Sequence, residues 1–339
     1  MSQPSGISNR MKGSRRIIIN VFLSALGVLS IVFMLKYSDI SAKMIADNIG
    51  NTKWHYLIGV VLTTFGTVLL TGQKWKIILG DLANMKAVGK GYFLYYSALG
   101  LVSNSVVPYI GNYGLKTVSL KLLHDVPVNN GALSILIEQL FDLLILILLL
   151  LPSLLFFLNV MSLEASLIVT LAIFLSSFVV LTHNRKVIFG VMTRGYGFLY
   201  QVASRISLIR HRLSENPAAL AKCGVFSETT AIKLFLYSCL RELCLVLRVY
   251  FVMSNSHIDI PFFAILLGTA LIQAIMLVIV VPAALGVLEG GWFGVLTVLG
   301  IDKAAAGIFI VSLRILGETS LLLVTLVSYL YYMANRRKE

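Results

Sequence analysis

The sequence predicts an all-α, polytopic integral membrane protein with about seven full spans and two broken or re-entrant segments of opposite orientation. Of the 339 residues, 58% are hydrophobic and 13% are charged, and the mean hydropathy is +0.89. Such a chain is too apolar for a soluble domain. Leu/Ile/Val-rich runs of about 20 residues, the length that crosses the hydrocarbon core, recur along it. Their continuity favours helices over the alternating strands of a barrel.

Seven runs are long enough to be spans. The first, 17–35, follows a basic stretch but lacks a small-x-small cleavage site, so we expect a retained anchor rather than a signal peptide. The other six lie at 55–72, 128–150, 163–182, 230–253, 260–281 and 304–333.

The basic residues predict which span ends face the cytoplasm. They cluster in the N-terminus, in the segment from Lys74 to Lys90, in a long loop at 183–228 and in the last residues of the chain. The connections near 36–53, 152–164 and 254–260 carry little net positive charge. We therefore expect a protein of the cell (cytoplasmic) membrane with both termini in the cytoplasm.

This placement of basic residues also accounts for the net charge of +13, so no nucleic-acid partner is expected. The 183–228 loop has a mixed apolar and basic pattern. It is expected to lie on the anionic leaflet as an amphipathic helix, and the alternative is a dock for a cytosolic lipid-modifying enzyme.

Two apolar segments are interrupted where a span should be continuous. The first contains Pro108, Gly111 and Gly114, and the second contains Pro282 and Gly286. Proline removes a backbone donor and glycine loosens a helix, so each segment is expected to break and free polar groups that must face protein or water. Paired breaks of this kind mark binding sites in transporters.

The charge-based topology gives the two broken segments opposite orientations. Segment 91–127 begins and ends in the cytoplasm, whereas segment 258–302 begins and ends outside. Each is either a re-entrant hairpin or a pair of short spans. Units at about 55–150 and 230–333 then form an inverted repeat within a single transmembrane domain, 1–339, which is an architecture of transporters.

Ionisable residues inside the apolar runs are the candidate site. Glu138 and Asp142 lie one helical turn apart, and each would cost at least about 2.5 kcal/mol if it were unpaired at the centre of the membrane. Arg241 and Arg248 are seven residues apart and share a helix face, on which Lys233 is also expected. The remaining candidates are Glu289, within the second break, and the pair Arg314 and Glu318.

Two interpretations of these charges remain open. They can be internal ion pairs that fix helix register, with Arg314 bound to Glu318 and with Glu138 or Asp142 bound to Arg241 or Arg248. Alternatively they line a polar cavity for a lipid headgroup. Its phosphate would meet Arg241, Arg248 and Lys116, and a cationic group would meet Glu138, Asp142 or Glu289.

No catalytic motif accompanies these residues. The chain contains no H-E-x-x-H, P-loop or G-x-S-x-G sequence. Its five histidines are scattered and its three cysteines lack metal-ligand spacing, so neither a metal nor a cofactor is expected.

The motifs resemble the flippase-like transmembrane region of lysylphosphatidylglycerol synthases and their stand-alone relatives. The features that carry the resemblance occur in family order over most of the chain. They are Trp75 with basic neighbours, the break Asn104…Pro108…Gly111…Gly114…Lys116, the Glu138…Asp142 pair, Pro282…Gly286…Glu289 followed by Gly300, and Arg314. The resemblance makes Asn104 part of the first break.

Two positions depart from the family pattern. Lys116 stands where the family commonly has arginine, and Gln139 stands where an arginine commonly follows the glutamate. At position 116 the ammonium group of lysine therefore replaces the planar guanidinium group of arginine, and at position 139 a positive charge is lost. The headgroup preference is expected to differ from that of the named synthases.

In the large synthases this region is implicated in moving lysyl-phosphatidylglycerol between leaflets. The sequence ends at Glu339, a few residues past the last span, and the resemblance implies the translocation half without the aminoacyltransferase half. We expect a protein that binds an anionic or modified phospholipid, or a lipid-linked sugar, in a central polar cavity and passes it across the bilayer. The alternatives are an enzyme, or a subunit of one, that modifies lipids, and a small-solute transporter.

Overall fold

The computed structural model describes residues 41–83, 88–106, 110–183, 228–278 and 284–336. Helices joined by short turns make up these residues, with no strand among them, and the all-α class is confirmed. The expected first span, 17–35, and almost all of the basic 183–228 loop lie outside the described residues.

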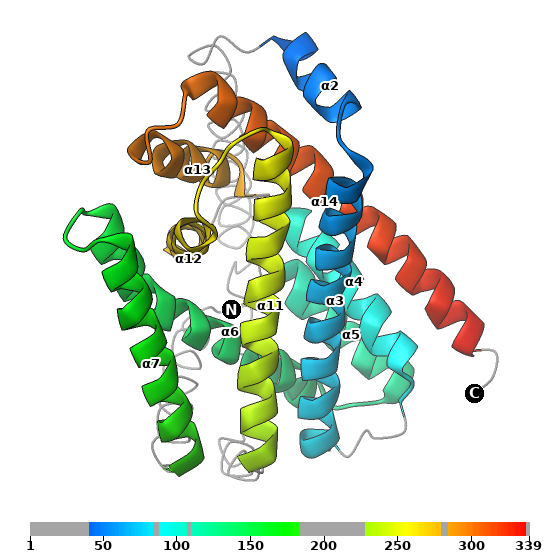
Figure 1. Ribbon diagram of the computed structural model, residues 1–339. Helices are drawn as coiled ribbons and strands as arrows, with labels where there is room; N and C mark the ends of the chain where they lie inside the picture. The colour runs from blue at the N-terminus through cyan, green and yellow to red at the C-terminus, as the bar shows by residue number, and fades with distance from the viewer. Residues whose placement is uncertain (1–40, 84–87, 107–109, 184–227, 279–283, 337–339) are drawn as a thin grey trace, which may run out of the picture.

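Each of the six predicted runs between 55 and 333 coincides with a described helix, and further helices lie between them (Figure 1). The described helices are α2 (Ala42–Gly50), α3 (Trp54–Ala83), α4 (Lys90–Val106), α5 (Ile110–His124), α6 (Val128–Phe157), α7 (Leu163–His183), α11 (Glu228–Asn255), α12 (Phe262–Val278), α13 (Val287–Val298) and α14 (Lys303–Arg336).

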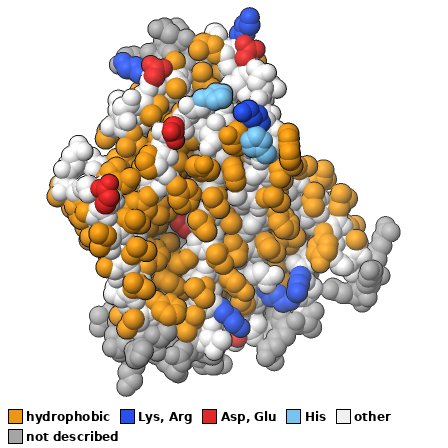
Figure 2. All heavy atoms as spheres, in the orientation of Figure 1, with side chains coloured by type: hydrophobic (Ala, Val, Ile, Leu, Met, Phe, Trp, Pro, Cys, Tyr) orange, Lys and Arg blue, Asp and Glu red, His pale blue; other side chains and the backbone are white. Residues whose placement is uncertain are grey.

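Four of the described helices are both long and apolar enough to cross a membrane. They are Trp54–Leu82, Val128–Phe157, Leu163–Val180 and Lys303–Arg336. α11 has 28 residues and sufficient length, but Arg241, Glu242 and Arg248 interrupt its apolar character. Hydrophobic side chains cover most of the face seen in Figure 2, and Lys and Arg gather towards its upper and lower margins. These features describe a polytopic membrane protein.

α3 and α11 lie side by side and antiparallel. Thr230, at the start of α11, donates a hydrogen bond of 2.9 Å to Asp81 near the end of α3. At the other end of the pair, the Asn255 amide donates to Thr52 Oγ1 at 3.1 Å. These bonds define two ends of the molecule, which we name the Asp81 end and the Asn255 end.

α14 runs obliquely between the same two ends (Figure 1). Near its start, Ser312 donates to Asn48 of α2 at 3.0 Å, and near its C-terminus Tyr332 packs against Tyr92, with 6.4 Å between ring centroids. The segments expected on the cytoplasmic side therefore meet at the Asp81 end. Which end faces the cytoplasm, and whether the two units form an inverted repeat, stay predictions.

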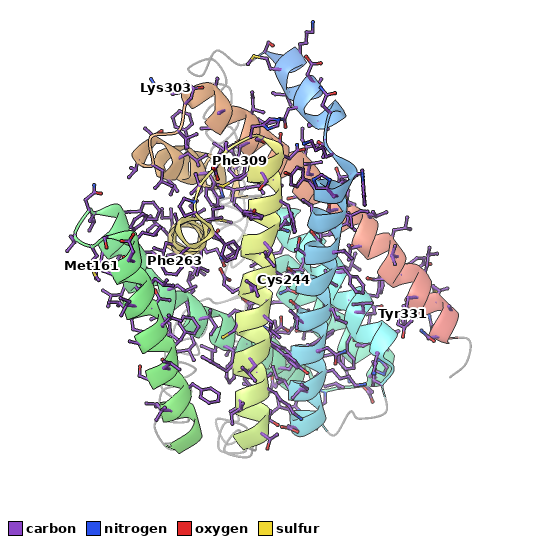
Figure 3. The ribbon with its side chains drawn as sticks, in the orientation of Figure 1. Met161, Cys244, Phe263, Lys303, Phe309 and Tyr331 are labelled. Atoms are coloured by element: carbon purple, nitrogen blue, oxygen red, sulfur yellow. The ribbon has the colours of Figure 1, made fainter. Side chains whose placement is uncertain are left out.

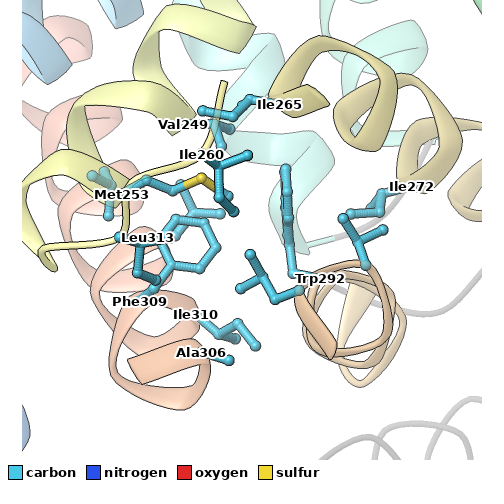
Figure 4. Packing of buried hydrophobic residues seen from close by; sticks show 14 of the residues in the cluster. Val249, Met253, Ile260, Ile265, Ile272, Trp292, Ala306, Phe309, Ile310 and Leu313 are labelled. Carbon is cyan, nitrogen blue, oxygen red and sulfur yellow. The ribbon is translucent and has the colours of Figure 1, made fainter. Parts of the chain in front are cut away.

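A hydrophobic cluster fills the Asn255 end, where α11, α12, α13 and α14 meet (Figure 4). Trp292 of α13 meets Phe309 of α14 edge to face, with 5.5 Å between ring centroids, and both side chains are buried. This packing positions the short α13 helix against α14, which brings Glu289 close to Arg314.

The first interrupted segment is a pair of short helices. α4 and α5 have 17 and 15 residues, or about 26 Å and 23 Å at 1.5 Å per residue, less than the roughly 30 Å of a hydrocarbon core. α4 ends at Val106 and α5 begins at Ile110, while Pro108 lies outside the described residues.

Three of the expected break residues lie inside helices instead. Asn104 belongs to α4, and Gly111 and Gly114 belong to α5. Gly111 has a packing role, because a Cβ there would lie 2.4 Å from the carbonyl oxygen of Ser103. The glycine allows α5 to lie directly against α4, and it does not interrupt the helix.

The second interruption separates α12 from α13. α12 ends at Val278, and Pro282 lies outside the described residues. Gly286 is the N-cap of α13 and has a left-handed backbone, with φ of 78°; Ala284 also has a positive φ, of 50°. Glycine suits this turn because it has no Cβ to clash with the carbonyl oxygen.

Candidate functional site

Ionisable side chains from several helices meet inside the bundle. We name them the buried charge network: Lys74, Lys116, Glu138, Asp142, Arg241, Glu242, Arg248, Glu289, Arg314 and Glu318. The set contains five cations and five carboxylates, so it carries no net formal charge. Balanced charge is what a low-dielectric interior requires, because unpaired ions there are strongly destabilising.

The pair nearest the Asp81 end joins α5 to α6. Lys116 Nζ lies 3.0 Å and 3.2 Å from the two carboxylate oxygens of Glu138, and the two side chains are 0% and 1% exposed. The same ammonium lies 4.9 Å from the ring of Trp75, whose indole donates to Ser134 at 3.1 Å. This pair is fully enclosed by protein.

Asp142 is the acceptor at the centre of the network. It pairs with Lys74, accepts a hydrogen bond of 2.8 Å from Ser238, and lies 3.5 Å from Arg241 Nη1. Asp142 and Arg241 are partly accessible, at 13% and 18% exposed. Glu138 also lies close enough to influence Lys74 and Arg241, so this group continues from the first pair.

Lys74 is a site residue that the sequence did not single out. Its expected place was a cytoplasmic connection, but α3 continues to Ala83 and the Lys74 side chain is fully buried. A signal was present in the helical spacing. Thr63, Thr67, Thr71 and Lys74 recur every three or four residues along one buried face of α3, and such a polar face within an apolar run indicates an internal site.

Arg314 of α14 binds the beginning of α13. Its Nε and Nη2 donate to Glu289 Oε1 at 3.0 Å and 2.5 Å. The other carboxylate oxygen of Glu289 accepts the Gly286 backbone N–H at 2.8 Å, so one buried side chain both caps α13 and attaches it to α14. Glu318, the expected partner of Arg314 in the same helix, lies farther away at 3.8 Å.

Arg248 lies between the two halves of the network. Glu318 and Arg241 act electrostatically on its guanidinium group, and its Nε is buried with no hydrogen-bond partner among the described residues. Lys233 was expected on the same face but is exposed. Eight residues turn an α-helix about 80° beyond two full turns, which takes Lys233 away from the face of Arg241.

Glu242 is a buried acid on α11. It accepts a hydrogen bond of 2.6 Å from the Gln273 amide of α12. Gln273 was not expected at the site, although it is a polar residue in an otherwise apolar helix. In the part of the chain that the structure describes, no cluster of histidine, cysteine or carboxylate side chains could hold a metal ion.

The network occupies the middle part of the bundle. Glu138 lies ten residues into α6 from the Asp81 end, and Arg314 lies eleven residues into α14 from the Asn255 end, or about 15 Å and 17 Å of helix. The Lys116–Glu138 pair is enclosed and Glu289 is 4% exposed, whereas Arg314 and Glu318 are 24% and 44% exposed. The arrangement can bind a ligand that carries both an anionic and a cationic group.

The transmembrane-region model of lysylphosphatidylglycerol synthase matches residues 17–327. That range includes all ten residues of the buried charge network. No curated protein and no solved structure matches the chain.

Proposed function

The chain belongs to the lysylphosphatidylglycerol synthase transmembrane family, and we propose that it moves a phospholipid, or a lipid-linked headgroup, across the cell membrane along the buried charge network. Family membership supports a lipid-related role in a membrane. The proposal adds translocation as the activity and assigns the ten network residues to the path.

The observation that carries the proposal is the series of oppositely charged side chains in the middle of the bundle. Asp142 pairs with Lys74 and Arg241, Glu318 acts electrostatically on Arg248, and Arg314 pairs with Glu289 and lies 3.8 Å from Glu318. A charged group at the membrane centre costs about 2.5–3.5 kcal/mol or more without partners. A line of exchangeable partners lowers this barrier at each position along the path.

The side chains also match the two kinds of charge on a headgroup. Arginine guanidinium groups bind phosphate through two parallel hydrogen bonds, which suits Arg241, Arg248 and Arg314. Asp142 and Glu318 are partly accessible and can accept hydrogen bonds from an amine. An aminoacylated or zwitterionic headgroup could therefore exchange with the internal ion pairs.

The burial of the Lys116–Glu138 pair supports a closed position on the side of the Asp81 end. Lys116 and Glu138 are inaccessible, whereas Arg314 and Glu318 can be reached. In this conformation the Lys116–Glu138 pair would act as the gate towards the Asp81 end. A headgroup passing there would have to replace each partner of the pair.

The test is leaflet-to-leaflet movement of labelled lipid. The purified protein is reconstituted into liposomes with fluorescent phospholipids that carry anionic, zwitterionic or aminoacylated headgroups, and a membrane-impermeant reductant bleaches the outer leaflet. We expect the bleachable fraction to rise only in liposomes that contain protein, with a dependence on the headgroup. Folded protein that moves none of the headgroups would reject translocation and would favour a lipid-presenting subunit of an enzyme.

A further inference from the structure

We propose that a second lipid site lies outside the buried charge network, in a groove between α3, α4 and α14 that binds an anionic glycerophospholipid. Its acyl chain would lie along the groove and its phosphate between Lys76 and Lys90. Binding at this site does not depend on translocation.

The groove has a volume of about 260 Å³ and mainly apolar walls. Phe65 and Leu69 contribute from α3, Phe93 from α4 and Val327 from α14. The volume approaches the lower end of the range for small-molecule sites, about 300–1,000 Å³. It can hold part of an acyl chain.

Gly72 allows the two helices that form the floor to approach closely. A Cβ at this position would lie 3.1 Å from the carbonyl oxygen of Phe93, which is tighter than ordinary packing. Phe65, Leu69, Gly72 and Lys76 follow one another at helical spacing along one stripe of α3. The stripe is apolar over most of its length and basic nearest the Asp81 end.

Lys76 and Lys74 point in different directions. Two residues turn a helix by about 200°, so the Lys74 side chain faces Asp142 inside the bundle while Lys76 lines the groove. Lys90 lines the groove from the first residue of α4. Neither Lys76 nor Lys90 forms an ion pair with a carboxylate in the described parts of the chain.

Aromatic side chains place the mouth of the groove at headgroup depth. Tyr331, labelled on α14 in Figure 3, lines the groove. Beside it, Tyr95 stacks on Tyr332 with 5.6 Å between ring centroids, and Tyr92 and Tyr96 adjoin the same ring. Tyrosines are enriched at the boundary between hydrocarbon and water.

The chemistry of the groove selects its occupant. Two ammonium groups at its mouth complement an anionic headgroup, and a surface lysine near an anionic leaflet attracts such lipids. A free phosphate ion has no apolar surface to bury against Phe65, Leu69 and Val327. A lipid without net charge would have no net electrostatic attraction to Lys76 and Lys90. The combination fits an anionic lipid taken from the bilayer at the Asp81 end.

The test measures lipid binding to the full chain, purified and delipidated in detergent, by native mass spectrometry. Phosphatidylglycerol and phosphatidylcholine of identical acyl chains are titrated against the wild type and the double variant Lys76→Gln/Lys90→Gln. The matched control is Lys233→Gln/Lys121→Gln, which removes two exposed lysines from other faces near the same end.

We expect the wild type to bind phosphatidylglycerol more tightly than phosphatidylcholine. The Lys76/Lys90 variant should lose about 25-fold in affinity for phosphatidylglycerol, from roughly fivefold for each lysine, and the control should lose none. Equal affinity of the wild type for both lipids, or an equal loss in the control, would overturn the site. Binding without lipid movement in liposomes would reject translocation and leave this site standing.

Discussion

The Lys116–Glu138 pair gives the sharpest test of the buried charge network. Replacing Glu138 with glutamine leaves the Lys116 ammonium enclosed without a counter-charge, since both side chains are at most 1% exposed. Breaking a buried ion pair from one side costs about 3–5 kcal/mol. We expect the lower part of that range, because the glutamine oxygen can still accept a hydrogen bond from the lysine.

The reciprocal change should be at least as destabilising. Lys116→Met leaves the Glu138 carboxylate unpaired and also removes the ammonium 4.9 Å from the Trp75 ring, a contact that contributes about 0.5–2 kcal/mol. The double variant Lys116→Met/Glu138→Met removes both charges. Replacement of a buried pair by apolar side chains is often neutral, so we expect stability within about 1 kcal/mol of the wild type.

The assay is unfolding of the wild type, Lys116→Met, Glu138→Met and the double variant in one detergent, followed by circular dichroism and analysed as a double-mutant cycle. Additive losses in the double variant would refute a direct, buried pair. The same proteins are then reconstituted for lipid movement. We expect the double variant to be stable but inactive, because the gate has lost its exchangeable charges; normal transport would remove Lys116 and Glu138 from the path.

Two further predictions concern the helix interruptions. Gly111→Ala should destabilise the protein by about 1–3 kcal/mol, because the added Cβ would lie 2.4 Å from the Ser103 carbonyl oxygen. Gly114→Ala in the same helix has open space and should be neutral or stabilising by about 0.5–1 kcal/mol; equal effects in unfolding experiments would contradict the packing role. Arg314→Lys should speed hydrogen exchange in the first turn of α13, since lysine cannot reproduce both hydrogen bonds to Glu289, and unchanged exchange would show that this pair does not hold the turn.

Much of the fold could be predicted because hydropathy and helix length are local properties. The runs at 128–150, 230–253 and 304–333 correspond to α6, α11 and α14. α6 is longer than its run at the C-terminal end, and α11 and α14 are longer at both ends. The predicted run at 55–72 is too short, since a lysine at position 74 is typical of a charged connection. The burial of Lys74 depends on Asp142, which lies 68 residues away in sequence, and nothing local indicates that partner.

The candidate site was predictable by residue type but not by pairing. Intramembrane charge singled out Glu138, Asp142, Arg241 and Arg314, and all four lie in the network. Spacing within one helix predicted Glu318 as the closest partner of Arg314. The structure instead gives Glu289, because the α13 turn brings a second helix close to α14.

Lipid movement by the wild type and two matched aspartate variants tests the central claim most directly. Asp142→Asn removes the charge that links Lys74 to Arg241, whereas Asp302→Asn makes the same chemical change at the exposed start of α14, where asparagine caps a helix equally well. The account predicts that the wild type and Asp302→Asn move labelled phospholipid between leaflets and that folded Asp142→Asn does not. Movement at the wild-type rate by Asp142→Asn would contradict a path along the buried charge network.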